Sequence, residues 1–496
     1  MKFSCRCTVL VLTGAVLLFN FSARADLRLA AIFGNDMVLQ QQMPVPVWGW
    51  AAPGAEVAVK FAGQTKTTRA GADGKWLVKL GKLRASAEPQ SLVVESGETK
   101  TFTNILVGEV WLCSGQSNMQ KPIGGTSWAK PCFNAQQELA AANFPNIRIF
   151  QVEMNLSGAP LEDLQKFYGW QPCSSNALNS INFSAAAYFF GREIHTNLNV
   201  PVGLIESSWG GTRIEPWTPP TGFEKIPSLA QLATPVAAGT NKIPNTQPMV
   251  IYNAMIAPIA GFAMRGALWY QGESNLSGNT NKTDHPDYLT YADKMAALVG
   301  GWRQIWGEGV FPFYFVQIAP FKYYSRSRVS SAEALPEFWT IQSRATRRIK
   351  NTGMVVTTDL VDDLDDIHPR DKQDVGHRLA LLARNRTYGE KDAVCSSPVF
   401  RKVEFASGKA ILTFEHVDGG LVSKDGHPLT WFTIAGADGK FVPADAKIVG
   451  DTVEVVAAGV EKPKAVRFAW DETAQPNLFN GSGLPAEPFR SDDSLK

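Results

Sequence analysis

Apolar runs and helical periods alternate between residues 105 and 392, and this alternation constrains the fold more than any other feature. The apolar runs lie at 109–113, 202–205, 266–269, 313–318 and 354–357. Amphipathic helical periods lie at 185–195, 288–305, 340–349 and 372–386. Alternation of this kind is typical of parallel strands joined by crossover helices. It predicts an α/β domain over 105–392, with a parallel sheet covered by helices on both faces.

The two flanks have a different pattern. Residues 26–104 alternate apolar and polar side chains over short runs, with turn signals at 53–54, 71–74 and 96–97. This pattern predicts an N-terminal β-sandwich-like domain. Residues 393–496 return to short strands separated by Gly and Asp turns, which predicts a C-terminal β-rich, sandwich-like domain. A chain of 496 residues is too long for one compact core, so several domains are expected.

The first 25 residues read as a signal peptide. Lys2 and Arg6 precede an apolar segment at 9–18, and Ala23-Arg24-Ala25 forms a small-x-small cleavage site. The apolar segment is too short to span a bilayer comfortably, so stable membrane insertion is not expected. The sequence therefore predicts an exported protein, periplasmic or extracellular.

The charge balance argues against polyanionic partners. Without the first 25 residues the chain has 45 basic and 46 acidic residues, a formal charge of −1. No strong field of either sign follows, so nucleic acid is not an expected partner. The oligomeric state is not indicated by any pattern.

Four cysteines lie beyond the signal peptide. Cys132 and Cys173 are the favoured disulfide pair, because both lie in polar, loop-like sequence of an exported protein. Cys113 lies in an apolar run, and burial as a small hydrophobic residue is favoured. No zinc-binding spacing occurs, and the acidic stretch 359–374 lacks the spacing of a calcium loop. Neither a metal nor a cofactor is expected.

A serine follows the first apolar run of the central part. Ser117 comes shortly after 109–113, with Gly115 two residues before it. A nucleophilic serine needs such an exposed turn and a base beside it. The turn is not Gly-x-Ser-x-Gly, because Asn118-Met119 follows, so the α/β-hydrolase elbow is excluded.

A carboxylate and a histidine complete the constituents of a serine esterase. Asp365 lies three residues before His368, downstream of the apolar run 354–357. In open α/β sheets the carboxyl ends of the strands form the ligand-binding edge. Ser117, Gly210-Gly211, Gln271 and His368 all follow predicted strands, so we expect them to converge on one pocket.

Four sequence blocks carry a family resemblance. They are Gly-Gln-Ser-Asn-Met at 115–119, Trp-Gly-Gly-Thr at 209–212, Trp-Tyr-Gln-Gly-Glu-Ser-Asn at 269–275 and Asp-Ile-His-Pro at 366–369. In this order they resemble the sialate O-acetylesterase family of the SGNH (GDSL-like) hydrolases. The similarity extends from about residue 30 to the Phe489-Arg490-Ser491-Asp492 stretch.

The resemblance implies a role for each block. Ser117 is expected to be the nucleophile, His368 the general base and Asp365 the residue that orients the imidazole. Asp366 stays open as an alternative. The oxyanion hole is expected to use the N–H of Ser117, the Gly210-Gly211 pair and a side chain of the third block. That block departs from the usual Gly-x-Asn. Gln271 is favoured as donor because its amide can project into the site, and Asn275 is the rival.

The resemblance also implies a substrate. Trp209, Trp269 and Glu273 are candidate substrate-binding residues, although core packing is the default for any one tryptophan and Glu273 is also a candidate loop-ordering residue. The expected function is hydrolysis of O-acetyl esters of sugars, sialic acids first, by a Ser-His-Asp acyl-enzyme mechanism. An esterase of plant polysaccharide such as acetylated xylan and a non-catalytic carbohydrate-binding protein are the alternatives.

Overall fold

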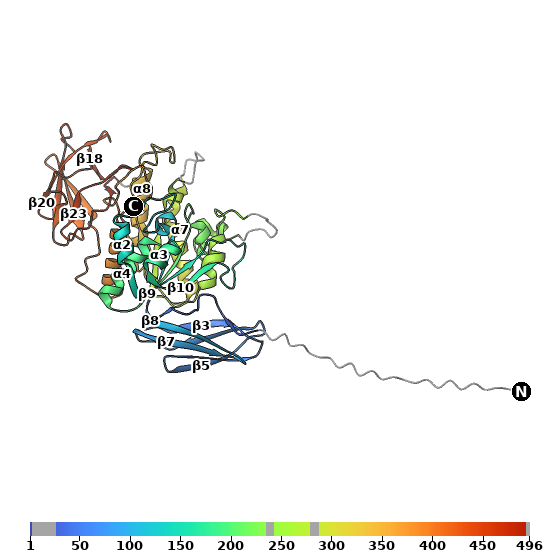
Figure 1. Cartoon of the computed structure of the whole chain (residues 1–496). Helices are drawn as coiled ribbons and strands as arrows, with labels where there is room; N and C mark the ends of the chain where they lie inside the picture. Colours follow the sequence, from blue (N-terminus) through green and yellow to red (C-terminus); the bar gives the residue numbers. More distant parts are fainter. Residues whose placement is uncertain (2–25, 235–242, 278–286, 493–496) are drawn as a thin grey trace.

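The structure is a computed structural model that describes residue 1 and residues 26–234, 243–277 and 287–492. Residues 2–25, which include most of the predicted signal peptide, lie outside the described residues. Figure 1 shows three parts: a central unit of strands and helices, the N-terminal strands below it and the C-terminal strands to its left.

The central sheet has the strand order β10-β9-β11-β8-β12-β13-β14. Each neighbouring pair from β9 to β14 is parallel, and β10 joins the edge antiparallel. The bounds are β8 Thr99–Gly115, β9 Asn143–Val152, β10 Phe167–Ser174, β11 Val202–Ser208, β12 Gly266–Tyr270, β13 Phe313–Val316 and β14 Thr352–Val355. The predicted parallel α/β sheet is confirmed.

Helices cover both faces of this sheet. On one face α4 (Ala185–Leu198) packs against α9 (Lys372–Leu382); on the other, α7 (Tyr291–Trp306) packs against α5 (Pro220–Phe223) and α8 (Ala334–Arg348). Successive buried residues of β8 alternate between two cores: Trp111 and Cys113 join the core under α4 and α9, and Val110 and Leu112 join the other. Burial on both faces explains why these strands read as continuous apolar runs.

Strand β8 belongs to two sheets at once. Its first half pairs with β7 (Ser86–Glu95) and β2 (Val38–Gln40), and its second half pairs with β11 and β12. The predicted boundary between residues 104 and 105 therefore falls inside one continuous strand of 17 residues. The other N-terminal strands are β1 Arg28–Leu29, β3 Val45–Trp50, β4 Glu56–Phe61, β5 Gln64–Arg69 and β6 Lys75–Leu80.

The C-terminal part has its own core of short strands. They form two four-stranded sheets, β15-β16-β21-β20 and β19-β18-β22-β24, and the pair β17-β23. The bounds are β15 Val399–Ala406, β16 Lys409–Glu415, β17 Leu421–Ser423, β18 Phe432–Ala435, β19 Phe441–Pro443, β20 Asp445–Val449, β21 Thr452–Val456, β22 Ala465–Phe468, β23 Leu478–Asn480 and β24 Phe489–Arg490. Arg467 forms an ion pair with Glu333, just before α8, at 2.9 Å.

The described residues also form the short α-helices α1 Ser117–Gln120, α2 Ala135–Ala141, α3 Ser175–Ser180 and α6 Glu273–Ser277. They form the 3-10 and π helices η1 Glu215–Trp217, η2 Pro227–Ala233, η3 Tyr252–Ile256, η4 Ala257–Ile259, η5 Asp287–Thr290 and η6 Ala383–Thr387 as well. Among the residues that the structure describes, none forms a helix with the length and apolar character needed to cross a membrane.

Candidate active site

Three adjacent strands end at the same point of the central sheet. After β8, the amide of Gln116 donates to the carbonyl of Tyr270 at 2.9 Å, and the amide of Trp209 donates to the carbonyl of Gly115 at 3.0 Å. Gly115 has φ +145°, and a Cβ there would lie 2.2 Å from the Tyr270 carbonyl oxygen. Only glycine permits this close approach, which places Ser117 at the carboxyl end of β8.

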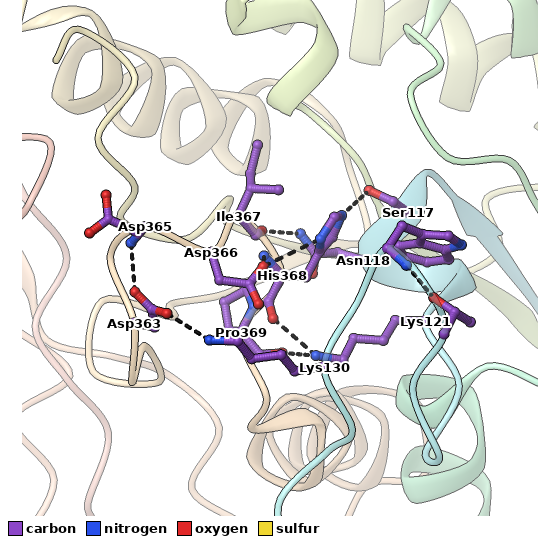
Figure 2. Close-up of polar contacts among 12 residues, drawn as sticks. Ser117, Asn118, Lys121, Lys130, Asp363, Asp365, Asp366, Ile367, His368 and Pro369 are labelled. Atoms are coloured by element: carbon purple, nitrogen blue, oxygen red, sulfur yellow. Dashed lines mark hydrogen bonds and ion pairs between the residues drawn. The ribbon is translucent and has the colours of Figure 1, made fainter. Parts of the chain in front are cut away.

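The structure brings Ser117 and His368 together. His368 lies in the loop between β14 and α9, and its Nε2 is 2.9 Å from Ser117 Oγ (Figure 2). The His368 side chain is 12% exposed, so one edge of the imidazole is reachable from outside. A hydroxyl and an imidazole at this distance are suitably placed for proton transfer.

The carboxylate beside the imidazole belongs to Asp366. Its Oδ1 lies 3.5 Å from His368 Nδ1 and accepts a hydrogen bond from the His368 backbone amide at 2.9 Å. Asp365 instead points away from the imidazole (Figure 2) and binds Lys322 and Arg326 at 2.8 and 2.9 Å. The prediction that Asp365 orients the imidazole is corrected: adjacent side chains diverge, and two cations hold this one at the surface.

The surroundings keep the imidazole uncharged. Burial, with the neighbouring Lys372 and Lys121 cations, lowers the pKa of His368 from 6.5 to about 4, against an opposing effect of Asp366. The ring is therefore neutral at physiological pH and has a free lone pair for a proton.

Ser117 and His368 open onto a cavity of about 500 Å³. Its wall includes three large side chains that can contact an organic substrate, Trp128, Met154 and Trp209, and one guanidinium, that of Arg328. Trp128 is 42% exposed, and its ring meets the His368 ring edge-on at 5.1 Å between centroids. A concave site in which such apolar side chains lie beside convergent polar groups is typical of small-ligand binding.

The glycine pair Gly210-Gly211 lies beside Ser117. A Cβ at Gly210 would lie 3.2 Å from the Cβ of Ser117, and Gly211, with φ +74°, also lines the cavity. The Gly210 amide donates to Gln120 Oε1 at 2.9 Å. Within the described ranges, neither the Ser117 amide nor the Gly211 amide has a protein acceptor.

The two side chains predicted as oxyanion donors face the protein interior. The Gln271 amide nitrogen donates to Gln116 Oε1, the Thr212 carbonyl and Asn275 Oδ1 at 3.1, 3.1 and 2.8 Å. The Asn275 amide nitrogen donates to Glu215 at 3.0 Å. Both residues are buried, and neither lines the cavity. The predictions for Gln271 and Asn275 as oxyanion donors are thus corrected, because their side-chain N–H groups form hydrogen bonds to neighbouring loops of the protein.

Two of the three candidate substrate-binding residues line the cavity, and the third does not. Trp209 and Glu273 line the cavity, but Trp269 is fully buried and packs edge-on against Trp217 and Trp302, so its prediction is wrong. Glu273 accepts a hydrogen bond from Asn118 at 2.6 Å through Oε1, and its Oε2 has no hydrogen-bond partner among the residues that the structure describes. Burial raises the pKa of Glu273.

The cysteines do not form the predicted disulfide. Cys132 and Cys173 are both buried as free thiols, and Cys395 and Cys113 are also free. The pairing prediction is wrong because each thiol is buried in the hydrophobic core as a free side chain, and Cys173 lies in strand β10 and not in a loop. Cys113 is fully buried, as predicted. The described residues contain no cluster of three or more His, Cys, Asp or Glu side chains able to hold a metal ion.

Several residues of the site carry no signal in the sequence. Trp128 and Arg328 belong to loops without a motif. Lys121 and Lys372 do lie close in sequence to Ser117 and His368, and Lys121 Nζ donates to the His368 carbonyl at 2.9 Å. Proximity to the motifs was the only available indication for these two lysines.

Comparison with known proteins agrees with this geometry. Residues 107–384 match the family described as carbohydrate esterase, sialic acid-specific acetylesterase. The sialate O-acetylesterases of Homo sapiens and Pongo abelii are each 31% identical, with 94% of this chain and 93% of each relative covered. A carbohydrate acetylesterase from Xanthomonas citri, solved by crystallography, is 36% identical, with a TM-score of 0.82 and 94% and 99% of the two chains covered.

These matches extend over nearly the whole chain, beyond the four blocks, and they agree with an SGNH-type α/β fold. The chain belongs to the carbohydrate esterase family of sialic acid-specific acetylesterases and is a carboxylic ester hydrolase of O-acetylated carbohydrates.

Proposed function

We propose that the enzyme cleaves sugar O-acetyl esters through an acetyl-enzyme on Ser117. The observation that carries this mechanism is the 2.9 Å contact between Ser117 Oγ and His368 Nε2 at the wall of the cavity. Ser117 Oγ attacks the acetyl carbonyl while His368 takes its proton. The tetrahedral intermediate then expels the sugar oxygen, which receives that proton from His368.

Water completes the cycle in the second half-reaction. His368 takes a proton from the water, the resulting hydroxide attacks the acetyl carbonyl, and acetate leaves as Ser117 regains its proton. Asp366 faces the Nδ1 side of the ring, where a carboxylate stabilises the imidazolium without taking the proton.

Backbone amides are the proposed oxyanion donors. Gly210 lies beside Ser117, and the amides of Ser117 and Gly211 have no acceptor in the described protein. An amide donor aimed at the developing oxyanion is worth about 3 kcal/mol of barrier.

For the substrate we propose an O-acetylated sialic acid. Two of the relatives bear that substrate in their names. The cavity agrees, because Arg328 lines it and forms no ion pair within the described ranges. A sugar acid supplies the carboxylate that a guanidinium binds, and an exposed ring such as Trp128 supplies an apolar contact surface.

One assay tests chemistry and substrate together. Acetate release is measured on O-acetylated sialic acid, on acetylated xylan and on an aryl acetate, with Ser117→Ala as control. We expect turnover that Ser117→Ala abolishes, and a preference for the sialic acid that Arg328→Gln reduces by about tenfold or more. If the enzyme prefers acetylated xylan and Arg328→Gln leaves the rate unchanged, a neutral polymer and not a sialic acid is the substrate. Absence of any Ser117-dependent turnover would leave the carbohydrate-binding alternative.

We also propose that the protein is exported, on the basis of the N-terminal 25 residues. Expression of the full-length chain in a bacterial host, followed by N-terminal sequencing of the periplasmic fraction, should give a chain beginning at Asp26. Recovery of the intact N-terminus in the cytoplasm would contradict export.

A further inference from the structure

Two lysines are buried beneath the loop that carries His368. Lys121 and Lys372 are both fully buried. Lys121 follows α1, the short helix that begins with Ser117, and Lys372 is the first residue of α9. The function proposed above uses neither residue, yet burying two ammonium groups is costly unless they are well hydrogen-bonded.

Each ammonium group links the nucleophile segment to the base loop. Lys121 Nζ donates to the carbonyls of His368 and Pro369 at 2.9 and 3.2 Å. Lys372 Nζ donates to the Pro369 carbonyl at 2.6 Å and to Asn118 Oδ1 at 3.0 Å. Asn118 also donates to the Ile367 carbonyl at 3.0 Å, and Figure 2 shows Asn118 and Lys121 beside the residues of this loop. Together with Lys372, three side chains therefore hold the loop against the turn of Ser117.

The bonded partners of both lysines are neutral. In the part of the chain that the structure describes, no carboxylate lies within ion-pair distance of Lys121 or Lys372, and the contacts are carbonyl and amide oxygens. The positive charges are thus compensated only at longer range. Burial, with the charge of Lys121, lowers the pKa of Lys372 to about 7, and burial also lowers the pKa of Lys121.

We propose that Lys121 and Lys372 are positioning residues for the esterase reaction: they fix the His368 loop against Ser117, and their charge prevents the imidazole from taking up a proton before the reaction. The proposal rests on the proposed function, in which a neutral His368 is the general base. Below neutral pH both lysines carry a charge, so protonation of His368 would place a third cation in the same buried cluster.

The effect of the two lysines on the pKa of His368 has to be distinguished from the effects of other charged groups near the imidazole. Asp366 favours the imidazolium and therefore acts against the lysines. Groups that act on the lysines, or line the same cavity, are Glu273, Arg328, Asp362, Arg370, Asp371 and Cys132. Since the charges of Lys372, Asp366 and Lys121 are those that act most strongly on His368, changing one lysine should move the titration of His368 directly.

The experiment replaces each lysine by glutamine, which retains a hydrogen-bond donor and removes the charge. The variants are Lys121→Gln and Lys372→Gln, with Lys372→Met as a variant that removes donor and charge. Lys130→Gln is the matched control, because Lys130 lies in a neighbouring loop but is 54% exposed and pairs with Asp363. Loss of this charge is screened by solvent. The measurement is the pH profile of kcat/KM on an aryl acetate, from pH 4 to 9.

We expect the acid limb of the profile to shift to higher pH by about one unit in both glutamine variants and in Lys372→Met. Lys130→Gln should match the parent. Lys372→Met should in addition lower kcat by about tenfold or more across the whole range, because Asn118 and Pro369 lose their donor. A uniform loss of rate with an unmoved acid limb would overturn the electrostatic role.

A second readout does not depend on turnover. In protein with ¹³C-labelled histidine, the His368 resonance is assigned with His368→Gln, and its titration is followed in Ser117→Ala and in Ser117→Ala with Lys372→Gln. We expect a higher pKa for His368 when Lys372 is replaced, and an unchanged pKa would overturn the proposal. If the parent enzyme shows no Ser117-dependent turnover but the titration still shifts, the proposed function fails while the electrostatic coupling stands.

Discussion

At the scale of single residues, the adjacent aspartates 365 and 366 have opposite surroundings. Asp366 lies against the imidazole, while Asp365 is half exposed and paired with two cations. Asp366→Asn should therefore lower kcat/KM by about 10²–10⁴. Asp365→Asn, the matched change one residue away, should stay within about threefold of the parent. Steady-state kinetics on an aryl acetate check both, and a larger loss at Asp365 would restore the original prediction.

The titration of His368 predicts the pH dependence of the reaction. Its folded-state pKa of about 4 lies below the ordinary 6.5, so the free enzyme should keep full kcat/KM at pH 5.5 and lose it only nearer pH 4. The same shift affects stability. As pH falls from 6.5 toward 4, the unfolded chain takes up this proton first, so the contribution of His368 to the free energy of unfolding is lost over that range. An acid limb of the kcat/KM profile with its midpoint at pH 6.5 would contradict the lowered pKa of His368.

Gln271 should act through stability and not through the oxyanion. Its amide joins Gln116, Thr212 and Asn275, and its Oε1 accepts from Tyr291 at 2.8 Å. Gln271→Ala removes a buried network, so we expect a loss of about 2–4 kcal/mol in the free energy of unfolding. At a temperature where the variant is folded, kcat should fall by less than tenfold. Thermal denaturation with kinetics tests this, and a hundredfold fall in kcat with unchanged stability would contradict it.

The residue-level predictions differ in how far the sequence could support them. The proximity of Ser117 to His368 was predictable because both residues follow strand ends, and parallel strands bring those ends together. The direction of a side chain within a loop has no such rule. Asp365 and Asp366 differ only in which way each points, and Gln271 turns inward because Gln116, Thr212 and Asn275 offer buried partners.

At the scale of elements, the turn after β8 requires glycine at position 115. Gly115→Ala places a Cβ 2.2 Å from the Tyr270 carbonyl oxygen, at a positive φ that alanine disfavours. We expect a loss of about 2–4 kcal/mol in the free energy of unfolding. Gly300→Ala is the control, because Gly300 lies inside α7 with no atom near its added Cβ, and it should stabilise the protein by about 0.5–1 kcal/mol. Chemical denaturation measures both, and a neutral Gly115→Ala would contradict the close approach.

The order of strands and helices was predictable because each apolar run of the central sheet is buried on two faces. The continuity of β8 across the predicted domain boundary was not predictable from the sequence. Residues 99–104 are exposed or half-buried, while residues 105–115 are all buried. The periodicity therefore changes inside one strand, and such a change in pattern resembles a domain boundary.

At the scale of the whole molecule, the N-terminal strands share β8 with the sheet that positions Ser117. The Glu109 carboxylate on β8 accepts from Gln40 and Gln41 at 3.1 and 2.7 Å and pairs with Arg265 at 2.6 Å. Trp170 donates to the Ile32 carbonyl at 2.8 Å. Deletion of residues 26–98 would uncover the first half of β8 and leave Glu109 without two of its donors. We expect an insoluble product, tested by soluble yield, whereas a soluble, active fragment would contradict the shared strand.

The shared strand also sets an order in which the molecule can assemble during synthesis. The first half of β8 pairs with β7, which immediately precedes it in the chain, so this pairing closes a short loop. The second half must wait for β11 and β12, which begin at residues 202 and 266. Closing those longer loops is slower. The β7–β8 hairpin can therefore form first and offer β8 as an edge strand to which β11 and β12 add later. The turn of Ser117 reaches its final conformation only after Tyr270 has been synthesised, because the Gln116 amide donates to the Tyr270 carbonyl.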